Sequence, residues 1–186
     1  MRQTWRQAIA YSVADGTAIA NSTTETLIFS PAPTIQADTL ADGKIISGRC
    51  FGKYSTTATP TLRFRLRYGT ATGGVLLADT GTVTLTTITN AIFFIEFWLT
   101  VRSNGSAGTL FAFIIASLGS GLAPSVGSAT NASADVIGGS AGVTAPAVSA
   151  ACDFTAATAL SLTATWSAAS ASNTLTGNNL YMFDEN

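Results

Sequence analysis

Hydrophobic side chains follow one another almost without interruption along Ala91–Arg102, AIFFIEFWLTVR. In a β-strand, successive side chains point to opposite faces of the sheet. One face of this strand carries only apolar residues. The other face carries large and mostly apolar residues, namely Ile92, Phe94, Glu96 and Trp98. A strand that is apolar on both faces is expected to be covered on both. The second cover must come from another part of the chain or from another copy of it, and we expect another copy.

Alternation and turn residues predict further strands along the chain. The clearest is Thr61–Tyr68, which places apolar residues on one face and Arg63, Arg65 and Arg67 on the other. Asn104-Gly105 lies between two apolar runs, and such a dipeptide predicts a hairpin that folds Thr109–Ser117 back onto Ala91–Arg102. The remaining predicted strands are Glu25–Phe29, Lys44–Tyr54, Val75–Ala78, Thr82–Ile88, a weak strand near Asp135–Val143, Ala159–Trp166 and Leu180–Phe183, with a turn at Asn173–Asn179.

This pattern of short strands, with turn signals between them and no amphipathic helix, predicts an all-β fold. Sandwiches and barrels are the two architectures that fit such a pattern. For a chain of 186 residues we expect an antiparallel, jelly-roll-like β-sandwich formed by residues 25–186. A jelly roll leaves sheet edges and apolar faces exposed, and a trimer around a threefold axis would hide them. We therefore expect a homotrimer.

Residues 1–24 do not follow the spacing of a strand or of a helix. Their apolar residues Trp5, Ile9, Tyr11 and Val13 recur with a period of neither 2 nor 3.6. One interpretation is an edge strand with a disordered end. The other is an irregular N-terminal arm that lies on a neighbouring subunit or on a larger particle. We expect the second, with these four residues as candidates for the particle contact.

Charge and length exclude several classes of partner. Charged residues make up only 10% of the chain, where ~25% is usual, and the net charge is −1. We therefore expect no nucleic-acid partner and no anionic membrane partner. The apolar run Leu110–Leu118 is far shorter than the ~20 residues of a membrane span. No signal-peptide pattern follows the first arginines, which predicts synthesis in the cytoplasm without export.

The residues needed for catalysis are scarce. The sequence contains no histidine, the commonest general base and metal ligand. Its acids are scattered, and Asp38 with Asp42 supply too few ligands for a calcium site. Cys50 and Cys152 are interpreted as two buried thiols, since two cysteines make no zinc site or disulfide framework. We expect no enzymatic activity, no metal and no cofactor.

Three stretches resemble virion proteins of tailed bacteriophages. They are Ala164–Leu175 continuing into Asn179–Tyr181, Ala37–Gly43, and Pro60–Arg67. The likeness is confined to these stretches and includes neither the first 24 residues nor residues 119–149. It implies a jelly-roll structural protein of the phage particle, of the kind that decorates capsids as trimers.

These observations together lead to one main functional prediction. The chain is expected to decorate and stabilise a phage capsid as a homotrimer, in contact with the major capsid protein and located on the capsid surface. The candidate subunit interface consists of Ile92, Phe94, Glu96, Trp98, Arg63, Arg65 and Arg67. The arginines either form a solvated basic stripe or pair with Glu96 and neighbouring acids. The alternative function is a tail, connector or receptor-binding trimer of the same fold, which would hold a host carbohydrate.

Overall fold

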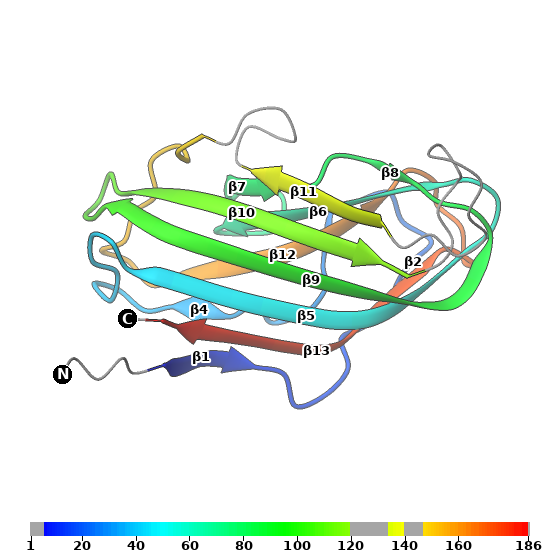
Figure 1. The fold of residues 1–186 in the computed structure, drawn as a ribbon, viewed down its shortest axis with the longest axis horizontal. Helices are drawn as coiled ribbons and strands as arrows, with labels where there is room; N and C mark the ends of the chain where they lie inside the picture. The colour runs from blue at the N-terminus through cyan, green and yellow to red at the C-terminus, as the bar shows by residue number, and fades with distance from the viewer. Residues whose placement is uncertain (1–5, 120–133, 140–146, 186) are drawn as a thin grey trace.

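The computed structural model describes residues 6–119, 134–139 and 147–185, and the regular secondary structure of these residues is β throughout. The strands form two antiparallel sheets that pack face to face as a sandwich (Figure 1). The predicted all-β antiparallel sandwich is therefore confirmed.

The first sheet, sheet A, has seven strands. Its order is β1 (Gln7–Tyr11), β13 (Thr174–Asp184), β5 (Ile45–Thr56), β9 (Ile88–Ser103), β10 (Thr109–Leu118) and β11 (Ala134–Gly139), and β2 (Ile19–Ala20) also pairs with β13. The second sheet, sheet B, has six strands. Its order is β3 (Thr26–Leu27), β12 (Thr158–Trp166), β6 (Thr61–Tyr68) and β7 (Val75–Asp79), with β4 (Thr34–Ile35) beside β12 and β8 (Val83–Thr84) beside β6.

The core lies between the two sheets and is built on β9. The inward-facing residues of this strand, from Phe93 to Val101, are at most 2% exposed. Two glycines of β5 make room for them. A Cβ atom added at Gly48 would lie 2.1 Å from the ring of Phe97, and one added at Gly52 would lie 2.5 Å from the ring of Phe93. Glycine within a strand often marks a place where another group approaches the backbone closely. Here the aromatic rings of β9 approach the backbone of β5.

Most predicted strands are present, with shifted ends. β6 has the predicted bounds, and the Asn104-Gly105 hairpin joins β9 to β10. The predicted Thr82–Ile88 strand is wrong as a unit, because β8 covers only two of its residues and Ile88 begins β9. Of the weak strand near Asp135–Val143, β11 covers the first part, and residues 140–143 lie outside the described residues.

The predicted turn at Asn173–Asn179 is also wrong. From Thr174 onward this segment is the first half of β13, which pairs with β5 through a bulge between Gly177 and Asn179. The segment contains a glycine and three asparagines, residue types that are common in turns, which is why the sequence predicted one. Gly177 instead allows the rings and methyl groups of Phe29 and Ile28 to approach the strand closely.

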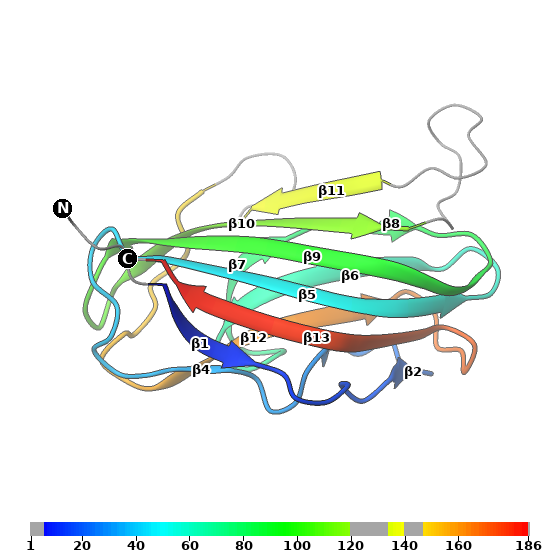
Figure 2. The same ribbon diagram turned by 60° about the horizontal axis from the view of Figure 1, so that its bottom comes forward.

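The described part of the N-terminal segment belongs to its own sandwich. β1 and β2 both pair with β13, and Figure 2 shows β1 alongside β13 at the edge of sheet A. The edge-strand interpretation therefore describes residues 7–20 better than an arm that leaves the domain. The pairing of β1 shifts between Ala8 and Ala10. This bulge breaks the period of two, which explains why the sequence does not show a strand pattern there.

Candidate interaction surface

The outer face of sheet A carries a broad group of large apolar side chains. No described segment crosses in front of β13, β5, β9 and β10 in Figure 1. Ile92 is 73% exposed and Phe51 is 39% exposed, and the other members are half-buried by one another. We call this surface the aromatic face; its members are Phe51, Ile92, Phe94, Trp98, Phe111, Phe113, Tyr181 and Phe183.

The rings of the aromatic face contact one another from strand to strand. Phe51 lies between Phe94, at 4.8 Å, and Tyr181, at 6.1 Å between ring centroids. Trp98 stacks on Phe113 across the β9–β10 hairpin with centroids 5.1 Å apart. Ring pairs at these separations stabilise a sheet face beyond the area that they bury. The aromatic face is therefore an ordered surface rather than a set of isolated exposed residues.

Charged side chains lie within and around the aromatic face. Glu96 accepts a hydrogen bond from Arg49 at 2.5 Å, and Arg6 pairs with Glu185 at 2.8 Å. The guanidinium of Arg6 also lies 4.2 Å from the ring centroid of Phe183, an arrangement in which a cation is attracted to the ring face. The predicted pairing of Glu96 with the arginines of β6 is wrong, because Glu96 and those arginines lie on the outer faces of different sheets.

The arginines of β6 form a separate ion network on the outer face of sheet B. Arg65 contacts Glu25 at 2.6 Å and Asp79 at 3.0 Å. Arg63 also pairs with Asp79, and Arg67 donates to Glu25 at 2.7 Å. The side chain of Asp79 is 2% exposed and that of Glu25 is 8% exposed. Each of the three arginines thus has an acidic partner within the domain, so the alternative of a solvated basic stripe is also wrong.

Burial and hydrogen bonding shift the pKa values of Asp79 and Glu25 in opposite directions. Desolvation raises the pKa of Asp79, but hydrogen bonds from Arg63, the Gly81 amide and Arg65 outweigh it and hold the pKa below its ordinary value. Desolvation likewise raises the pKa of Glu25, and hydrogen bonds from Arg67, Thr163 and Arg65 lower it overall. Both carboxylates therefore stay charged near neutral pH, as the network requires.

The structure divides the predicted interface residues into two groups. Ile92, Phe94, Glu96 and Trp98 lie together on the aromatic face, whereas Arg63, Arg65 and Arg67 lie on the opposite side of the molecule. Sequence reasoning missed Phe51, Phe113 and Tyr181, which come from neighbouring strands. The hairpin register, which places Phe113 opposite Trp98, was the signal that could have found one of them.

A second exposed apolar feature lies at the β1 edge of sheet A. Tyr11 is 71% exposed and Val13 is 89% exposed. We call the segment Tyr11–Asp15 the knob. The other two arm candidates differ from these: Ile9 is half-buried in β1, and Trp5 lies outside the described residues.

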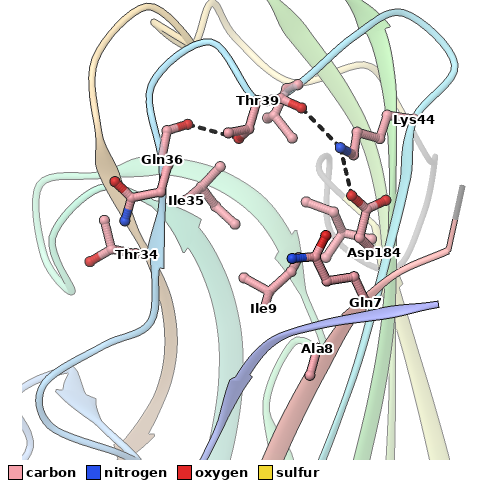
Figure 3. Close-up of a pocket in the computed structure, with 11 residues that line it drawn as sticks. Gln7, Ala8, Ile9, Thr34, Ile35, Gln36, Thr39, Lys44 and Asp184 are labelled. Carbon is pink, nitrogen blue, oxygen red and sulfur yellow. Dashed lines mark hydrogen bonds and ion pairs between the residues drawn. The ribbon is translucent and has the colours of Figure 1, made fainter. Parts of the chain in front are cut away.

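The open end of the sandwich contains a cavity of about 260 Å³ between β1 and β4 (Figure 3). Aliphatic side chains such as Ile9 and Ile35 form part of its lining, and the amides of Gln7 and Gln36 come from opposite walls. Lys44 pairs with Asp184 at 2.5 Å on the cavity wall. The lining is suited to a small ligand with several hydrogen-bonding groups and an apolar side.

The described residues contain no cluster of three or more His, Cys, Asp or Glu side chains that could hold a metal ion. Cys50 and Cys152 are buried free thiols, as predicted, and burial raises the pKa of both. No helix in the described part of the chain is long and apolar enough to cross a membrane.

Comparison with known proteins gives little further information. No protein-family model matches the chain, and no curated protein matches it in sequence. Among solved structures, the chain is similar to the CBM2 module of the evolved Dit of Lactobacillus casei BL23 phage J-1. The two are 9% identical, the match covers 100% of this chain and 99% of that one, and the TM-score is 0.36. A likeness at this score supports no conclusion about function.

Proposed function

We propose that this chain is a non-enzymatic structural protein of a bacteriophage virion, which decorates and stabilises the capsid as a homotrimer. The observation that carries the proposal is the aromatic face, an ordered apolar surface on a domain of low charge. The resemblance of three sequence stretches to tailed-phage virion proteins supplies the phage context. The major capsid protein is the proposed partner on the particle.

The size of the aromatic face suits an interface between proteins. Four strands spaced ~4.8 Å apart, over roughly ten residues with a rise of ~3.3 Å, make a face of roughly 600 Å². A stable protein–protein interface buries about 800 Å² on each partner. Apolar patches of about 300 to 600 Å² are the largest that monomeric soluble proteins usually expose, and such patches often mark interaction sites. The face is rich in phenylalanine, which has no hydrogen-bonding group for a sugar and packs best against apolar protein surface.

Particles prepared with and without the protein test this function. If the chain reinforces the capsid, heads that lack it lose their DNA at a lower temperature, and adding back the purified protein restores the original temperature. Labelled protein is expected on the shell in low-resolution images. Equal heat resistance of the two preparations, together with a label on the tail, would contradict capsid decoration.

A second candidate is a receptor-binding trimer of the phage tail that holds a host carbohydrate. The cavity of Figure 3 favours it, because amide, hydroxyl, ammonium and carboxylate groups line one small space beside an aliphatic wall. Such groups can bond the hydroxyls of a saccharide unit.

Saccharide binding to the purified chain distinguishes this candidate. A panel of mono- and disaccharides is titrated into the protein and followed by two-dimensional NMR. Binding in the cavity shifts the signals of Gln7 and Gln36, and the variants Gln7→Ala and Gln36→Ala weaken it at least fivefold, whereas Lys53→Ala on sheet A does not. An absence of shifts for every sugar would remove the candidate.

A further inference from the structure

We infer that the knob of one subunit packs onto the aromatic face of the next subunit, head to tail, so that the contacts close a ring. The inference rests on the proposed homotrimer and names its contact surfaces. The occupant of the aromatic face is thus a second copy of this chain, and the contact joins the β1 edge of one subunit to the central strands of the aromatic face of the next.

The knob is exposed but held in place. The Ser12 amide donates to the Leu180 carbonyl at 2.7 Å, and the Leu180 amide donates to the Ser12 hydroxyl at 2.8 Å. Beyond the knob, the Gly16 amide donates to the Gly177 carbonyl at 2.8 Å. These bonds tie both ends of the segment to β13 while Tyr11 and Val13 remain in solvent. A segment fixed before binding loses little conformational entropy when it binds, which favours a contact at this point.

The aromatic face offers a matching apolar site at its β5 and β9 strands. Ile92 and Phe51 are its most exposed members, and Phe94 lies against Phe51. The ring of Tyr11 and the branched side chain of Val13 can pack against these three residues, so that apolar surface is buried on both subunits. Aromatic residues of this kind carry much of the binding energy of protein interfaces.

Charge complementarity also favours this contact. Among the side chains that the structure describes, the aromatic face bears the cations Arg6, Arg49, Lys53 and Arg102 and the acids Glu96 and Glu185, an excess of two positive charges (4 − 2). Within the described part of the chain, Lys53 and Arg102 form no ion pair with an acid. The knob ends with Asp15, which is exposed and has no cationic partner among the same residues. Opposite charges on the two surfaces steer the subunits together and fix their orientation.

The positions of the two surfaces determine the symmetry. The knob begins at the β1 edge of sheet A, where Tyr11 lies opposite Tyr181 and so borders the aromatic face, whereas Phe51 and Ile92 lie on the central strands β5 and β9 (Figures 1 and 2). A contact between the edge of one subunit and the centre of the next subunit's face is not self-complementary, so it repeats from subunit to subunit and closes into a ring when the rotation allows. A face-to-face dimer would instead bring two surfaces with excess positive charge together, which is unfavourable in a desolvated interface.

Engineered disulfides between subunits test the arrangement. The variants Val13→Cys and Ile92→Cys are prepared separately, and the native cysteines do not interfere because both are buried. After mild oxidation, the head-to-tail contact predicts a disulfide-linked dimer only when the two variants are mixed. Thr84→Cys, at an exposed site of sheet B, is the matched control and is expected to link to neither.

Four other outcomes overturn the inference in different ways. Dimers formed by Ile92→Cys alone would show that two aromatic faces meet, and dimers formed by Val13→Cys alone would show that two β1 edges meet. A trimer in sedimentation equilibrium without any linkage in the mixture would leave the homotrimer standing and reject these contact surfaces. A monodisperse ~19 kDa species at micromolar concentration would reject both the homotrimer and the inference.

Discussion

At the scale of single residues, the ion network of sheet B shows how a charged stripe becomes part of the fold. Asp79 lies on β7 next to β6, so one buried carboxylate meets two arginines that point to the same face. Glu25, just before β3, completes the network from the other side. A buried network of this kind is stable only while each charge has its partner, because an unpaired buried charge is costly.

Replacing Asp79 with asparagine is expected to destabilise the domain. The substitution removes the negative charge that Arg63 and Arg65 share, and hydrogen bonds to charged groups are worth about 1.5 to 3 kcal/mol. Urea denaturation followed by circular dichroism measures the change. Asp42→Asn, at an exposed turn position, is the control and should stay within about 0.5 kcal/mol of the parent. Equal midpoints for the two variants would show that the network contributes nothing.

The same two acids predict how stability depends on pH. Their pKa values are lower in the folded chain than their ordinary values of 3.8 for Asp79 and 4.5 for Glu25. The unfolded chain therefore takes up protons at a higher pH than the folded chain. Their contribution is fully present above about pH 5 and is lost as the pH falls through the folded values. Urea midpoints between pH 3 and 7 should fall less steeply for Asp79→Asn than for the parent, and parallel profiles would contradict this.

At the scale of elements, β9 separates two environments within one strand. Its odd-numbered residues from Phe93 to Val101 lie in the core, and its even-numbered residues lie on the aromatic face. Neighbouring phenylalanines therefore have different roles. Phe93 fills the space above Gly52, whereas Phe94 contacts Phe51 on the outside.

This difference predicts opposite results for two adjacent substitutions. Phe93→Ala leaves a cavity in the core and is expected to cost about 3 to 5 kcal/mol of unfolding free energy. Phe94→Ala removes mainly a ring pair on an outer face and is expected to cost about 1 kcal/mol in the separated subunit. The comparison is made by urea denaturation at low protein concentration. A larger loss for Phe94→Ala would show that the assignment of the two faces is wrong.

At the scale of the whole molecule, low charge and an uncovered apolar face belong together. Only 10% of the residues are charged, and much of that charge is paired within the ion networks. The free subunit thus has little surface charge to keep it apart from its own copies. In the proposed ring, this uncovered apolar surface becomes the subunit contact.

Assembly of this kind links thermal stability to protein concentration. If subunits associate through the aromatic face, the Tm of the chain rises with protein concentration, since association stabilises only the folded state. Ile92→Asp places a charge at the most exposed apolar position of the face and is expected to abolish the rise. Thr84→Asp on sheet B should retain it. Scanning calorimetry over a hundredfold range of concentration measures both, and a constant Tm for the parent would contradict association.

The sequence by itself determined the all-β class, the β6 strand and the β9–β10 hairpin, because alternation and turn chemistry are local properties of the chain. It also identified Ile92, Phe94, Glu96 and Trp98 as members of a second apolar surface. The remaining members of the aromatic face come from β5, β10 and β13. Only the order and register of the strands could bring these residues together.

Tertiary structure alone decided the partners of charges and edges. Arg65 pairs with Glu25 and Asp79 rather than with Glu96. The reason is that β6, which carries Arg65, and β9, which carries Glu96, belong to different sheets. β1 and the first half of β13 became strands although their patterns are irregular, since backbone groups at a sheet edge gain hydrogen bonds wherever a neighbouring strand is available. Local patterns record which faces of a strand are apolar, but pairing energies between distant segments determine what each face meets.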